Sequence, residues 1–102
     1  MNKEVVEDFI SHFKGSEDVF LNGCCYWFAH ILFCCFNGEG RIVYSPILNH
    51  FAWLCDSYLY DASGGSLYAD RINENWVPWE WYYHNFPYES ARIVRECIWK
   101  IE

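Results

Sequence analysis

Apolar residues recur every three or four positions along the first stretch of the chain, residues 2–14. This spacing places them on one face of an α-helix and predicts that the face packs onto a core. Asn2 is a suitable N-cap, and acidic side chains occupy the first two turns, where the helix dipole favours negative charge. The pair Lys14-Gly15 is a typical helix stop signal. We therefore expect an N-terminal packing helix.

A second helix is predicted from Asn22 to about Phe36, and its residues are apolar nearly all the way round. Such a pattern is typical of a central, buried helix. Asn22 or the glycine after it can cap this helix, so that Cys24 and Cys25 lie in its first turn. Residues 37–40, Asn-Gly-Glu-Gly, accept positive φ values and end the helix.

Three short segments rich in β-branched and aromatic residues then predict strands, at residues 41–45, 48–55 and 58–62. The second and third of these strands meet at a tight turn at residues 56–57. Residues 62–66, with two glycines and two serines, are predicted to form a loop. The helices and strands together predict an α+β fold in which a central buried helix packs on a small antiparallel sheet.

The length of the turn at residues 56–57 decides which side chains share a face of the sheet. If it contains two residues, Ala52 lies opposite Asp61, and the alternation of side chains puts His50 and Asp61 on the same face. The two are then diagonal neighbours, about 7–8 Å apart along the backbone and within side-chain reach. One residue more or fewer in the turn would separate them.

The C-terminal third of the chain has a less regular pattern. Pro78 is predicted to be the first residue of a short helix that carries residues 79–83. Residues 88–101 are compatible with a helix, in which Arg92 and Glu96 are spaced to pair, or with a long edge strand.

The 102 residues are enough for one domain, which we take to span residues 1–102. Aromatic residues make up 22% of the chain. The core of so small a domain cannot hold all of them, so some must line a groove or an interface. The candidates for a substrate groove or a partner surface are Trp27, Trp76, Trp79 and Trp81.

The formal charge is −7, and the acidic residues are scattered rather than clustered. Too few Lys and Arg residues are present to displace counterions from a phosphate backbone, so nucleic-acid binding is not expected. The charge instead fits solubility or a basic protein partner. The N-terminus lacks the apolar segment of a signal peptide, and no run is long enough to cross a bilayer. We therefore expect a cytoplasmic protein whose six cysteines are mostly reduced.

The three residue types needed for thiol catalysis occur in a suitable order. Cys25 lies at a predicted helix start, where the positive end of the helix dipole favours a thiolate. His50 follows on a strand and can take the thiol proton, and Asp61 can hold the imidazole in one orientation. Backbone N–H groups at the helix start, with Asn22 and Cys24 beside them, can support an oxyanion.

In these segments the chain resembles the papain-like superfamily in its compact bacterial form, to which cell-wall amidopeptidases and transglutaminase-like domains belong. The shared features are Cys25-Tyr26-Trp27 at a helix start, a histidine that opens a strand and an aspartate at the end of the next strand. The chain is also similar to short uncharacterised proteins of phages and prophages of Gram-positive bacteria, which carry similar Asn-Gly-x-Cys-Tyr-Trp-Phe and Tyr-Asp-x-x-Gly segments. The resemblance covers about residues 20–65. It implies that Cys25 is the nucleophile, His50 the base and Asp61 the orienting residue.

A metal site is a competing interpretation of the same residue types. Two cysteine doublets, with His30 and His50, supply enough potential ligands. However, adjacent cysteines on a helix point about 100° apart, and the C-x-x-C spacing typical of zinc sites is absent. We expect no metal and no cofactor, and we expect the cysteines other than Cys25 to be buried as small apolar residues.

Two functions remain compatible with the sequence. The first is a small papain-like thiol hydrolase or acyl transferase that acts on an amide bond of a peptide or protein. The second is a non-catalytic, acidic phage-type protein that binds and inhibits a host protein in the host cytoplasm. The sequence leaves the oligomeric state open, and Cys24 competes with Cys25 for the place of the nucleophile.

Overall fold

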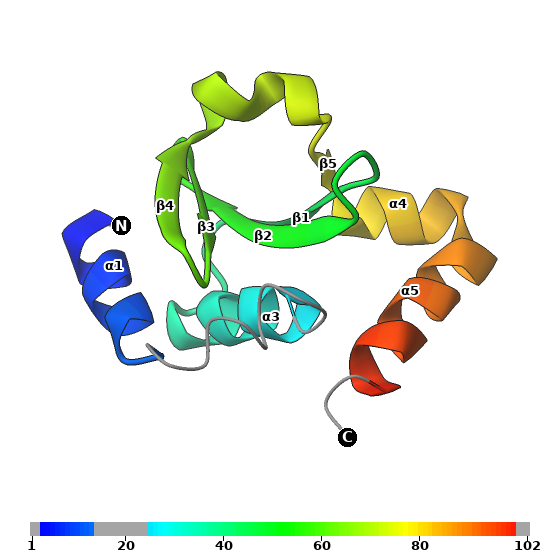
Figure 1. Ribbon diagram of the computed structural model, residues 1–102, viewed down its shortest axis with the longest axis horizontal. Helices are drawn as coiled ribbons and strands as arrows, with labels where there is room; N and C mark the ends of the chain where they lie inside the picture. The colour runs from blue at the N-terminus through cyan, green and yellow to red at the C-terminus, as the bar shows by residue number, and fades with distance from the viewer. Residues whose placement is uncertain (1–2, 14–24, 100–102) are drawn as a thin grey trace.

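An antiparallel sheet with strand order β4-β3-β2-β1-β5 forms the middle of the protein in a computed structural model that describes residues 3–13 and 25–99 (Figure 1). The strands are β1 (Arg41–Ser45), β2 (His50–Cys55), β3 (Tyr58–Asp61), β4 (Gly64–Leu67) and β5 (Val77–Pro78). The helices are α1 (Lys3–Ser11), α3 (Cys25–Cys35), the 3₁₀ helix η1 (Tyr68–Glu74), α4 (Trp79–Asn85) and α5 (Pro87–Trp99). The fold is therefore α+β, as the sequence predicted.

The two faces of the sheet carry cores of different size. In Figure 1, α1 and α3 lie on one side of the sheet and η1 arches over the other. Trp53 and Tyr60 point toward the α1–α3 side, where they form a cluster with Val6, Phe28 and Leu32. Trp53 and Tyr60 are at most 1% exposed, so this side holds the larger core.

A smaller cluster fills the η1 side of the sheet. It contains Val43, Ala52 and Leu59, from three adjacent strands, together with Trp76. Ala52 and Trp53 are neighbours in β2 and belong to opposite faces, which is the alternation expected of a strand that is covered on both sides.

Helix α3 packs against the sheet through one stripe of its surface. Its buried side chains are spaced three and four residues apart, the pattern of a single helix face. They are Cys25, Phe28, Ala29 and Leu32. The other described side chains of α3 are partly or fully exposed. The helix is thus central, as expected, although it is not buried all the way round.

The first predicted helix is confirmed as α1, whose buried residues are Val6 and Ile10. The predicted stop signal at Lys14-Gly15 lies outside the described residues. So do Asn22 and Cys24, and with them the predicted cap of α3. No helix in the described part of the chain is both long and apolar enough to span a bilayer.

The described cysteines are of two kinds. Cys25 and Cys55 are buried, whereas Cys34 and Cys35 are exposed. The prediction that Cys34 and Cys35 are buried is wrong. The buried face of α3 continues from Leu32 to Phe36, and both thiols lie outside this face, on the exposed side of the helix.

Strands β2 and β3 form the hairpin that the sequence predicted. The two residues of the turn at 56–57 have φ values of 48° and 71°, as in the type I′ turn favoured in tight hairpins. Trp53 pairs with Tyr60 in this hairpin. The same register makes His50 and Asp61 diagonal neighbours on one face, as predicted.

Residues 62–66 are not the loop that their glycines and serines predicted. They form a two-residue turn followed by most of strand β4. Gly65 pairs with Tyr60 of β3, and a Cβ atom on Gly65 would lie 2.7 Å from the Tyr60 ring. Glycine is needed at this position because the Tyr60 ring lies against the backbone. The same glycine made these residues look like a loop in the sequence.

The C-terminal part of the chain is helical. Pro78 occupies the N-cap position of α4 and not its first residue, because it also ends the two-residue strand β5. Residues 87–99 form the helix α5, so the alternative of an edge strand is wrong. The predicted pair of Arg92 and Glu96 is present, with 2.8 Å between Arg92 Nη1 and Glu96 Oε1.

A matched pair of substitutions tests how firmly α1 packs on the sheet. Val6 is 0% exposed and Val5 is 52% exposed. We expect Val6→Ala to lower the free energy of unfolding by about 2 kcal/mol, because it removes buried methyl groups. Val5→Ala makes the same change in helix propensity and should alter that free energy by less than about 0.5 kcal/mol. Urea unfolding measures both values, and equal effects would contradict the packing of α1.

Candidate active site

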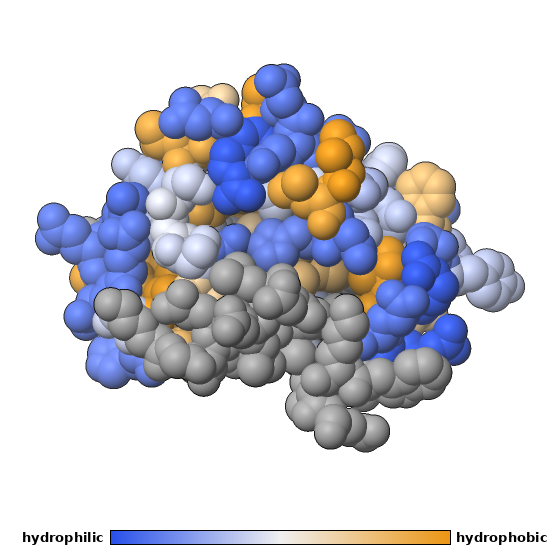
Figure 2. Space-filling model, viewed as in Figure 1, coloured by the Kyte–Doolittle hydropathy of each residue, from blue (hydrophilic) through white to orange (hydrophobic). Residues whose placement is uncertain are grey.

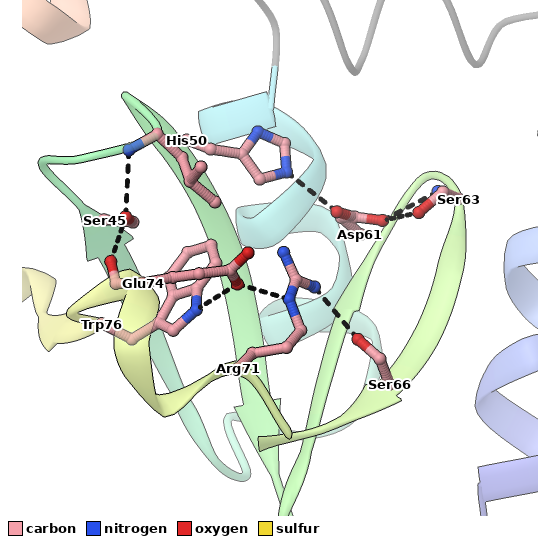
Figure 3. Close-up of polar contacts among 9 residues, drawn as sticks. Ser45, His50, Asp61, Ser63, Ser66, Arg71, Glu74 and Trp76 are labelled. Carbon is pink, nitrogen blue, oxygen red and sulfur yellow. Dashed lines mark hydrogen bonds and ion pairs between the residues drawn. The ribbon is translucent and has the colours of Figure 1, made fainter. Parts of the chain in front are cut away.

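His50 and Asp61 are joined by a hydrogen bond at the end of the sheet. The distance from His50 Nε2 to Asp61 Oδ2 is 2.8 Å, and the two side chains are only 14% and 9% exposed. The other oxygen of Asp61, Oδ1, accepts hydrogen bonds from the backbone N–H and the hydroxyl of Ser63, at 2.9 and 2.5 Å. Figure 3 shows the carboxylate held between the imidazole and the turn that carries Ser63. Asp61 is therefore fixed in orientation on both of its oxygens.

Cys25 completes this cluster from the first residue of α3. Its side chain is 6% exposed and packs among apolar residues of the sheet and of the C-terminal helices. The Cys25 thiol lies close enough to the His50 imidazole to raise the pKa of that ring. Because Nε2 of His50 is bonded to Asp61, Nδ1 is the nitrogen left for the thiol. The structure thus brings together the three residues that the sequence singled out.

The surroundings of His50 favour its protonated form. Burial alone would lower the pKa of His50, but the hydrogen bonds to Asp61 and Cys25, together with their charges, raise it to about 9. Burial would raise the pKa of Asp61, and its hydrogen bonds to His50 and Ser63 lower it overall. At neutral pH the pair is an imidazolium and a carboxylate.

Trp76 packs against His50 from the η1 side of the sheet. The two ring centroids are 6.2 Å apart, in an edge-to-face arrangement. Trp76 Nε1 donates a hydrogen bond to Glu74 Oε1 at 3.1 Å, and Arg71 pairs with the same oxygen at 2.5 Å. The Arg71 guanidinium also lies over the Trp76 ring, 5.2 Å from its centroid. These contacts, drawn in part in Figure 3, hold the tryptophan in place beneath the imidazole.

The four tryptophans considered for a groove or partner surface lie in different environments. Trp76 and Trp79 are buried, at 7% and 8% exposed, and Trp81 is 51% exposed. Trp27 is partly buried, and its Nε1 has no hydrogen-bond partner. Trp79 packs in the same cluster as Cys25. Trp76 thus packs beside His50 and Trp79 beside Cys25, whereas Trp81 lies on an open surface of α4.

Hydrogen bonds also fix the turn that precedes His50. The Ser45 hydroxyl donates to the backbone oxygen of Glu74 at 2.5 Å and accepts from the backbone N–H of Leu48 at 3.1 Å. The Tyr44 hydroxyl donates to the side-chain oxygen of Asn49 at 2.7 Å. Sequence reasoning missed these residues, because single polar residues in separate elements, two of them bonded to backbone atoms, leave no recognisable pattern.

Asn22 and Cys24, expected to support an oxyanion, lie outside the described residues. Between residues 25 and 99 and in residues 3–13, no group of three or more His, Cys, Asp or Glu side chains is arranged to hold a metal ion.

The fold and the cluster define a small α+β protein in which a cysteine, a histidine and an aspartate meet at the end of a sheet. The family model described as Phage YunG-like protein matches residues 3–98. This match covers nearly the whole chain, which therefore belongs to the Phage YunG-like family, and it confirms the resemblance to short phage proteins. Comparisons with curated proteins and with solved structures give no significant match, and nothing in them supports the papain-like resemblance.

The raised pKa of His50 can be measured by NMR titration of the imidazole. We expect a value near 9 and expect Asp61→Asn to lower it, because the amide removes the negative charge but keeps the side-chain shape. The folded pKa exceeds the unfolded value of about 6.5. The charged imidazole therefore contributes stability that is fully present below pH 6.5 and is lost as the pH rises through about 9. The exposed His84 provides a reference signal in the same spectra. A His50 titration that Asp61→Asn leaves unchanged would contradict the ion pair.

Proposed function

We propose that this protein is a small thiol hydrolase or acyl transferase of papain-like type, which acts on an amide bond of a peptide or protein. The observation that carries the proposal is the position of His50 between the Cys25 thiol and the Asp61 carboxylate. A nucleophile, a base within hydrogen-bonding range and a third group that orients the base are the parts that covalent catalysis requires.

In the proposed reaction, the Cys25 thiolate attacks the carbonyl carbon of the amide. The imidazolium of His50 gives its proton to the leaving amine, and the acyl group stays on the sulfur as a thioester. A water molecule or a second amine then attacks the thioester, His50 takes up its proton, and the Cys25 thiolate is released. Hydrolysis and acyl transfer differ only in this second nucleophile.

The start of α3 supports the proposal through its electrostatics. Cys25 is the first residue of the helix, and the first backbone N–H groups of a helix have no acceptor within it. These groups and the positive end of the dipole favour negative charge on the sulfur and on an oxyanion beside it. The arrangement also has the order of the papain-like resemblance, with the thiol on a helix and its partners on the following strands.

A second candidate function is supported by the surface of α4 and α5. Four aromatic side chains there are 48–92% exposed, and they are Trp81, Tyr83, Phe86 and Tyr88. Exposed aromatic residues are typical anchors of protein interfaces, and the formal charge of −7 fits a basic partner. On this proposal the protein binds and inhibits a host protein, and Cys25 has no chemical role.

Site-resolved alkylation separates the two functions. The chain provides internal controls, because Cys34 and Cys35 are exposed and Cys25 is buried. At pH 6 an ordinary thiol is only about 0.3% thiolate. We expect iodoacetamide at this pH to modify Cys25 at least about tenfold faster than Cys34 and Cys35. Peptide mass spectrometry of timed samples gives the three rates.

His50→Asn is the variant that tests the cause of this reactivity. It removes the imidazolium and should bring the alkylation rate of Cys25 below the rates of the two exposed cysteines. If Cys25 is already the slowest of the three in the unmodified sequence, as its burial alone would predict, the thiol is not activated. That result would contradict the enzymatic proposal and favour the binding function.

A further inference from the structure

Two large aliphatic side chains stand exposed on the turn that leads into His50. Ile47 is 66% exposed and Leu48 is 43% exposed. The space-filling view shows an apolar patch over the turn between β1 and β2, surrounded by hydrophilic residues (Figure 2). Single exposed apolar residues are ordinary, but these two are adjacent and lie beside the candidate active site.

The turn that carries them is held in one conformation. Ser45 bonds the Leu48 backbone N–H from one side, and Tyr44 bonds the Asn49 side chain from the other. Ser45 is itself tied to the backbone of Glu74. A fixed turn can bind an apolar group without a large loss of conformational entropy, because little of the turn remains to be ordered.

The turn that carries Ile47 and Leu48 lies on the leaving-amine side of the bond that reacts. Leu48 is two residues from His50, and two residues of chain span at most about 7 Å. In the proposed reaction His50 protonates the leaving amine, so the amine part of the substrate must lie on the His50 side of Cys25. The turn next to His50 therefore adjoins the leaving part of the substrate and not the acyl part.

The charge of the protein limits which groups the leaving-amine part of the substrate can carry. The protein has a formal charge of −7, and the Asp61 carboxylate already lies against the imidazole. An acidic substrate group would be repelled there, whereas an uncharged aliphatic group gains by covering the two exposed side chains.

We propose that Ile47 and Leu48 form an apolar subsite that binds an aliphatic side chain on the leaving-amine side of a peptide substrate. The inference rests on the proposed function, since it requires Cys25 and His50 to act on an amide. It adds the substrate class, which is a peptide with an uncharged aliphatic residue directly after the bond that reacts.

Two iodoacetamides that differ only in the group on the amide nitrogen test this subsite. Plain iodoacetamide has no side group, and N-isopentyl iodoacetamide carries a branched aliphatic group on the amine side of its carbonyl. We expect the isopentyl reagent to alkylate Cys25 at least about tenfold faster than the plain reagent. The rates are divided by those of Cys34 and Cys35 in the same molecules, which removes the intrinsic difference between the reagents.

The double variant Ile47→Ser/Leu48→Ser should abolish the isopentyl preference and leave the plain reagent's rate at Cys25 unchanged. Val5→Ser, which alters an exposed aliphatic residue on α1, should leave both rates unchanged. Fast alkylation by both reagents without a preference would overturn the subsite and leave the proposed function standing. Alkylation of Cys25 by plain iodoacetamide no faster than of Cys34 would overturn both.

A second copy of the chain is the other possible occupant of the patch. Sedimentation velocity of the unmodified protein and of the double variant distinguishes it from a substrate group. We expect the two proteins to sediment with the same mass at the concentration of the alkylation assay. Self-association that the double variant abolishes would overturn the subsite.

Discussion

The two-residue turn between β2 and β3 is the constraint on which the candidate site depends. Its type I′ geometry sets a register in which Trp53 pairs with Tyr60. Within that register His50 and Asp61 reach each other across the hairpin at 2.8 Å. A slip of one residue would send one of the two side chains to the opposite face of the sheet. The hairpin therefore specifies the chemistry of the site as well as the topology of the sheet.

The ion pair of His50 and Asp61 is costly to bury, and neighbouring hydrogen bonds offset that cost. Charged groups lose hydration free energy when they are removed from water. The attraction between the two charges offsets this loss only if their remaining hydrogen-bonding groups are also satisfied. Asp61 meets this condition through its two hydrogen bonds from Ser63. An ion pair of this kind contributes little net stability compared with an apolar pair of the same size. A pair with perturbed pKa values at the end of the sheet is what the proposed function requires.

Each side of the site is supported by a different part of the fold. Cys25 is placed by α3, whose buried stripe belongs to the core on the α1–α3 side of the sheet. Trp76 supports the imidazole from the η1 side, where Glu74 and Arg71 hold it. Because His50 opens β2 at the end of the sheet, its ring can contact groups from both sides. A residue in the middle of the strand would be confined to one face.

The sequence predicted the features that depend on local patterns. Helical spacing located α1, a stretch that is apolar nearly all the way round located α3, and the turn at residues 56–57 predicted the contact between His50 and Asp61. Strand β4 was missed because Gly65 carries no side chain to show a pattern, although it is the Tyr60 ring that requires glycine there. The support from Trp76 was not predictable, since it depends on how η1 folds back over the sheet. The hydrogen bonds of Ser45 involve backbone atoms, which no side-chain pattern reveals.

If Cys25 and His50 form one coupled unit, the protonation of His50 must depend on the presence of the thiol. The imidazole can be titrated by NMR in the unmodified sequence and in Cys25→Ser. Because the neighbouring Cys25 side chain raises the pKa of His50, we expect a lower pKa of His50 in Cys25→Ser. Identical titration curves in the two proteins would show that the thiol and the imidazole do not interact, and that Cys25 and His50 do not act as one unit.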